Sequence, residues 1–148
     1  MMVALQKSGG SFYHSIISCF SGKYNHSELI FDKLDIKKYW FGCDVKEGPR
    51  FTNIVPYPRN WDIFKLNIKK EQEQVVYRWC KSQVGCKYDF FEIIRFFNPF
   101  EYPSENNWGS TELCVSALQE IMLFNWTVPC HTSPNNFYDL IIRSSLLA

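Results

Sequence analysis

The hydrophobic pattern of this 148-residue chain changes near residue 69, and this change constrains the fold more than any other feature of the sequence. Before it, short runs of aromatic and β-branched residues are separated by turn residues, and residues 61–68 alternate between two faces. After it, apolar residues recur every three or four positions, as they do along one face of a helix. Strands followed by helices indicate an α+β domain rather than a wound parallel sheet.

The same patterns predict the individual elements. Strands are predicted over residues 12–20, 26–31, 39–45, 51–55 and 61–68, the first two as a hairpin. Helices are predicted over residues 70–84, 111–124 and 136–144, with a shorter helical or mixed apolar stretch over residues 89–97. We therefore expect a single domain, residues 1–148, in which an antiparallel sheet (strands about 12–68) packs against a helical half (about 70–144).

The composition argues against several classes of partner. The net charge is +1 and the basic residues form no clear face, so we expect no nucleic-acid binding. We find no signal peptide and no run of the ~20 apolar residues that a membrane span needs, which predicts a cytoplasmic protein. In a reducing compartment the six cysteines are expected to be thiols. No Cys-x-x-Cys pair occurs and the three histidines are scattered, so we expect no metal and no cofactor.

Cys114 is the candidate nucleophile. It lies in the first turn or so of the helix predicted over residues 111–124, after a polar loop. A helix N-terminus stabilises negative charge and lowers the pKa of a thiol. Its backbone N–H groups can also hold the oxyanion of an acyl intermediate. The alternative is a buried helical cysteine that only fills space, which is common for this residue.

His26 and Glu28 are the candidate base and the carboxylate that orients it. At positions i and i+2 of a strand, the two side chains project from the same face. A carboxylate beside an imidazole fixes its tautomer and stabilises the imidazolium form, as a thiol nucleophile requires. The alternative is a polar pair on a half-exposed strand. His14 is a rival base, but it has no carboxylate two residues away.

Five pieces of the sequence occur in an order typical of one family. The pieces are YNHSELIF (24–31), WDIFKL (61–66), GCKYD (85–89), ELCVSAL (112–118) and SPNNFYDL (133–140). Together they resemble the circularly permuted branch of the NlpC-type papain-like cysteine hydrolases, which is related to the lecithin:retinol acyltransferase group. His26 precedes Cys114, as the permuted order requires. The resemblance covers residues 12–142, although no single piece is specific.

The resemblance implies a permuted papain-like fold and a thiol-dependent acyl hydrolase with a Cys114-His26-Glu28 triad. It implies a peptidase or amidase that acts through a thioacyl-enzyme, with a lipid ester hydrolase or acyltransferase as the alternative. The substrate would be a peptide or a lipid acyl group. There is one departure from the family. Members of this branch commonly read Cys-Ser-Glu at the nucleophile, whereas this chain reads Cys114-Val115-Ser116.

A non-catalytic binding module on the same fold is the remaining alternative. Such a module would engage a protein partner, for example a host protein if the chain is viral, and the compartment would then be the host cytoplasm. The presence of all three residues of the predicted triad favours an enzyme.

Overall fold

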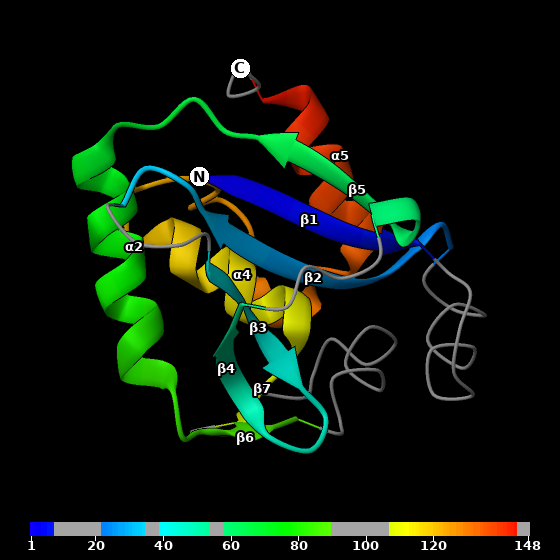
Figure 1. Ribbon diagram of the computed structural model, residues 1–148. Coiled ribbons are helices and arrows are strands. Elements are labelled where there is room, and N and C mark those ends of the chain that lie inside the picture. The colour runs from blue at the N-terminus through cyan, green and yellow to red at the C-terminus, as the bar shows by residue number, and fades with distance from the viewer. Residues whose placement is uncertain (8–21, 35–38, 54–57, 90–106, 145–148) are drawn as a thin grey trace.

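The computed structural model describes residues 1–7, 22–34, 39–53, 58–89 and 107–144 of the chain (Figure 1). The strand predicted over residues 12–20, and all but the first residue of the stretch 89–97, lie outside the described residues. The elements in chain order are β1 (Met2–Lys7), β2 (Tyr24–Phe31), β3 (Tyr39–Asp44), β4 (Gly48–Thr52), a 3-10 turn (Pro58–Asn60), β5 (Trp61–Lys65), α2 (Lys70–Gln83), β6 (Lys87–Tyr88), β7 (Asn107–Trp108), α4 (Ser110–Gln119), a 3-10 turn (Pro129–His131) and α5 (Pro134–Arg143).

Five strands form one sheet in the order β4-β3-β2-β1-β5, and every neighbouring pair is antiparallel. β6 and β7 form a separate two-stranded parallel sheet. With the three helices, the described residues confirm the predicted α+β class. The sequence predicts no strand before residue 12, so β1 was missed. β1 is short and contains Ala4 and Gln6, and it is held by ladders to β2 on one side and β5 on the other, which local sequence does not reveal.

The four predicted strands that reach into the described residues, and the first predicted helix, are confirmed with shifted ends. β4 begins at Gly48, where a turn was expected, because Gly48 adopts a φ of 72° and the chain turns back there. β5 ends at Lys65, three residues before its predicted end. α2 ends at Gln83, and Gly85 follows with a φ of 101°, a left-handed conformation that suits the predicted helix stop.

The two later helices depart further from their predicted bounds. α4 ends at Gln119 rather than at residue 124, because Met122 and Phe124 adopt φ values of 63° and 59°. This turn buries Phe124 completely and leaves Met122 75% exposed. α5 begins at Pro134, two residues early. The Ser133 side chain accepts the N–H of Asn136, and proline is favourable at the first helical position.

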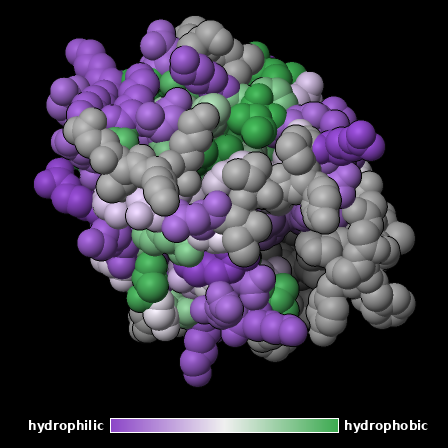
Figure 2. All heavy atoms as spheres, viewed as in Figure 1, coloured by the Kyte–Doolittle hydropathy of each residue, from purple (hydrophilic) through white to green (hydrophobic). Residues whose placement is uncertain are grey.

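The sheet separates two clusters of buried side chains. The larger cluster joins one face of the sheet, through Leu29 and Phe41, to residues of α2, α4 and α5. The smaller cluster lies on the other face and contains Ala4, Ile30, Trp40 and Trp61. Figure 2 shows that hydrophobic residues on the viewed surface form small separate groups between hydrophilic ones. The two faces of the sheet therefore have different surroundings, and this difference decides where each candidate residue can act.

Candidate active site

His26 and Glu28 lie together on β2, as their spacing predicts. His26 Nε2 is 3.3 Å from Glu28 Oε1, and the two side chains are 17% and 6% exposed. The His26 ring also packs edge-on against Trp61, with ring centroids 5.9 Å apart. A nearly buried carboxylate in contact with an imidazole fixes the ring's orientation.

Glycine at position 42 makes room for this carboxylate. A Cβ on Gly42 would lie 2.6 Å from Cγ and 2.8 Å from Oε1 of Glu28, closer than real contacts allow. The second carboxylate oxygen, Oε2, is buried and makes no hydrogen bond to the described part of the chain. A buried, unsatisfied carboxylate oxygen is costly, and such groups are often associated with function.

The pair faces away from α4. Ser27, between the two, places its hydroxyl 3.0 Å from that of Thr111 on α4. Because successive residues of a strand point to opposite faces, His26 and Glu28 point to the face that carries Trp61 and the smaller cluster. The Cα pairing of β2 with β3 runs only from Leu29 to Phe31, so the pair lies beyond the paired part of these two strands.

Cys114 occupies a different environment from the one expected. It is the fifth residue of α4, a full turn from the helix start, and it is completely buried in the larger cluster. The sequence places it correctly on a helix after a loop. The structure brings His26 and Glu28 together, but their side chains and Cys114 lie on opposite sides of the sheet.

The start of α4 holds two hydroxyl residues that are further candidates for the nucleophile. Ser110 is the first helical residue and is 4% exposed, and Thr111 follows it. The Glu112 carboxylate turns back to accept the N–H of Gly109 at 3.2 Å, which fixes the first turn. The signal that could have identified Ser110 is its triplet, because Ser110-Thr111-Glu112 keeps the spacing of Cys-Ser-Glu with serine in place of cysteine.

The other cysteines and histidines give no second centre within the described residues. Cys43 donates its thiol to the Trp108 carbonyl at 3.1 Å. Burial raises the pKa of the Cys80 thiol well above its usual value. The five described cysteines are thiols, and no group of three potential ligands for a metal ion occurs among the described residues. His131 lies in the 3-10 turn before α5, and His14 is outside the described residues.

Comparison with known proteins does not identify the chain. No protein-family model matches it, and no curated protein matches it. None of the helices in the described ranges is long and apolar enough to cross a membrane.

Proposed function

We propose that the chain is an acyl hydrolase of the permuted papain-like class that cleaves peptide or amide bonds, with His26 as general base and Glu28 as its orienting residue. The observation that carries the proposal is the 3.3 Å contact between His26 Nε2 and a carboxylate that is only 6% exposed. A nucleophilic site needs a base that is held by a carboxylate, and packing alone does not explain why a carboxylate is buried against a histidine.

As part of this proposal we place the nucleophile in the first turn of α4, at Ser110. Because His26 and Glu28 face away from α4, the proposal requires the His26 ring to reach Ser110 around the end of the paired strands. The helix dipole and the first backbone N–H groups act within that turn, where they stabilise an oxyanion. Thr111, the next residue, contacts the neighbour of His26 on β2. Cys114, expected from the sequence, is one turn further along and buried in the apolar cluster. It is kept as the alternative nucleophile, which would make the enzyme thiol-dependent.

The chemistry follows the usual order for such a triad. His26 takes the proton from the attacking hydroxyl as the oxygen bonds to the substrate carbonyl carbon, and then gives it to the departing amine. Water hydrolyses the resulting acyl-enzyme, with His26 again as base. The mechanism requires the nucleophile and His26 to meet beyond the paired part of β2 and β3. A lipid ester in place of the amide would follow the same steps.

The experiment that tests the proposal is covalent labelling followed by mass spectrometry. A fluorophosphonate reports an activated serine, and iodoacetamide titrated against pH reports a thiolate. We expect the fluorophosphonate to modify Ser110, and the rate to fall about 100-fold in His26→Ala, since a general base contributes on that order. His131→Ala is the matched control and should label like the wild type.

Each outcome assigns the site. Iodoacetamide could instead label Cys114 at a pH well below about 8.5, the ordinary pKa of a thiol. If that labelling is lost in His26→Ala, the nucleophile is Cys114. If neither Ser110 nor Cys114 is labelled faster in the wild type than in His26→Ala, the enzyme proposal is overturned. A binding module would then become the better explanation, and the opposite facing of Cys114 and His26 is the observation that favours it.

A further inference from the structure

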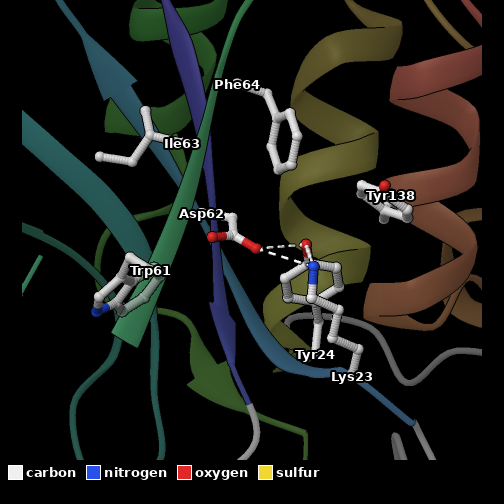
Figure 3. A pocket seen from close by; sticks show the side chains of 7 residues that line it. All are labelled: Lys23, Tyr24, Trp61, Asp62, Ile63, Phe64 and Tyr138. Carbon is white, nitrogen blue, oxygen red and sulfur yellow. Dashed lines mark hydrogen bonds and ion pairs between the residues drawn. The ribbon is translucent and has the colours of Figure 1, made fainter. Parts of the chain in front are cut away.

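The groove beside β5 and the loop after α4 both present apolar side chains on the described surface. In the groove, the Asp62 carboxylate accepts the Tyr24 hydroxyl at 2.7 Å and contacts Lys23 Nζ at 3.1 Å (Figure 3). The charged groups there bind one another. The loop after α4, residues 121–128 (the apolar loop), contains no charged residue, so its exposed side chains offer apolar contacts to a partner.

The apolar loop exposes three large side chains. Met122 is 75% exposed, Trp126 is 76% exposed and Val128 is 56% exposed. Among the described residues, these are the three most exposed large hydrophobic side chains. A single exposed apolar residue needs no explanation, but several gathered in one short loop mark an interaction surface.

Hydrogen bonds and packing hold the apolar loop in one conformation. Gln119 Nε2 donates to the carbonyls of Phe124 and Thr127 at 3.1 and 2.8 Å, and the Phe124 ring is fully buried beneath the loop. Met122 and Phe124 adopt φ values of 63° and 59°, a left-handed conformation that is costly for residues other than glycine. Backbone strain of this kind concentrates at sites that bind other molecules.

The charges around the apolar loop favour a neutral occupant. No Asp, Glu, Lys or Arg occurs from residue 121 to residue 138. The nearest charged residues along the chain, Glu120 and Asp139, are both acidic and exposed. Their carboxylates would repel an anionic surface, whereas the headgroups of zwitterionic phospholipids carry no net charge.

The small size of the apolar loop favours a lipid surface over a second protein. A stable protein interface buries about 800 Å² on each partner, from about 20–30 residues, which is far more than three side chains supply. Insertion into a bilayer needs fewer contacts, because each large apolar side chain that leaves water raises the partition coefficient about ten-fold or more. Tryptophan is enriched at the membrane–water interface, where its ring is in apolar surroundings and its N–H remains hydrated.

We propose that the apolar loop inserts Met122, Trp126 and Val128 into the interfacial region of a neutral phospholipid bilayer and so attaches the chain to it reversibly. Three side chains at about ten-fold each raise the partition coefficient about a thousand-fold in all. Binding of this kind is peripheral, with the chain lying on one face of the bilayer. It makes no use of His26 and goes beyond the proposed hydrolysis.

The test is flotation of the whole chain with phosphatidylcholine vesicles at millimolar lipid. We expect reversible binding that does not weaken with salt and does not strengthen when phosphatidylserine is added, because apolar insertion drives it. Met122→Ser and Trp126→Ala should each lower the partition coefficient about ten-fold, and the double variant should lower it about 100-fold. Val84→Ser is the matched control and should bind like the wild type, since Val84 is 51% exposed but lies outside the loop.

The Trp126 ring also provides a readout that does not depend on loss of binding. Phospholipids brominated on the acyl chain quench the fluorescence of a tryptophan that inserts beside them. We expect such quenching in the wild type and less of it in Trp126→Phe. This variant should still bind within a few-fold of the wild type, because phenylalanine is also a large apolar side chain.

Failure of the wild type to float, or flotation of the Met122 and Trp126 variants equal to that of the wild type, would overturn the proposal. Binding only to phosphatidylserine vesicles, lost at high salt, would overturn it in favour of adsorption through charges elsewhere. Sedimentation showing a dimer that Trp126→Ala dissociates would overturn it in favour of a second copy of the chain. His26→Ala should float normally, so this proposal and the proposed hydrolysis can fail independently.

Discussion

At the scale of single residues, Gly42 controls the position of Glu28. Its missing side chain leaves the space that the Glu28 carboxylate fills beside His26. We predict that Gly42→Ala lowers the free energy of unfolding by about 1–3 kcal/mol, as overpacking does. In the Glu28→Ala background the same change should cost much less, because the side chain that clashes is gone.

Urea unfolding of the wild type, both single variants and the double variant measures this coupling. An equal cost of Gly42→Ala in both backgrounds would mean that backbone strain, rather than the carboxylate, sets the penalty. If the prediction holds, Gly42→Ala should also slow labelling at the proposed nucleophile, since Glu28 could no longer orient His26.

The same scale shows why the candidate site was only partly predictable. The contact between His26 and Glu28 follows from strand geometry alone. Residues two positions apart in a strand project from the same face, so their spacing is enough to predict the contact. The face of the sheet that α4 covers is the one on which Ser27 contacts Thr111, and these two residues are far apart in the sequence. Local sequence therefore located Cys114 on a helix but did not predict that it would be buried on the far side of the sheet from His26.

At the scale of elements, Asp62 links three strands. It lies on β5 and binds Lys7 of β1 and Tyr24 of β2. Burial raises the pKa of Asp62, but hydrogen bonds from Lys7, Tyr24 and Lys23 outweigh it and lower the pKa to about 2. Because the folded pKa lies below the unfolded value of about 3.9, the carboxylate stabilises the fold above about pH 4. That contribution disappears as the pH falls toward about 2.

We therefore predict that the wild type loses about 1 kcal/mol of stability through this link between about pH 4 and pH 2, a small value because the group is partly exposed. Asp62→Asn should be less stable at pH 6 and should lack that part of the acid loss. Urea midpoints across this range measure it, with Asp139→Asn, an exposed carboxylate on α5, as control. Parallel acid profiles for Asp62→Asn and the wild type would contradict the assignment.

Elements were predictable to the extent that their signals were local. The three- and four-residue spacing located α2, short apolar runs bounded by turn residues located β2 and β3, and alternation located β5. β1 was missed because its strand character comes from pairing on both sides. The end of α4 was missed because its apolar spacing continues beyond Gln119, while the backbone turns to bury Phe124 against Phe137.

At the scale of the whole molecule, one buried carboxylate joins α2 to the sheet. Glu73 is fully buried, and its Oε2 accepts from the amino group of Met1 at 2.9 Å. Its Oε1 accepts the backbone N–H groups of Asp32 and Lys33 at 2.7 and 3.1 Å. The start of β1, the end of β2 and the first turn of α2 therefore meet at a single side chain.

We predict that Glu73→Gln lowers the free energy of unfolding by about 2 kcal/mol, because the buried Met1 ammonium would lose one of its two counter-charges and keep only the partly exposed Asp32 carboxylate. Glu71→Gln is the matched control, since Glu71 lies in the same helical turn but is exposed, and it should cost less than about 0.5 kcal/mol. Urea unfolding of both variants provides the comparison. Equal costs would mean that the helix dipole, which both carboxylates share, accounts for the effect. A larger cost for Glu73→Gln would show that the contact between α2 and the sheet depends on this buried ion pair.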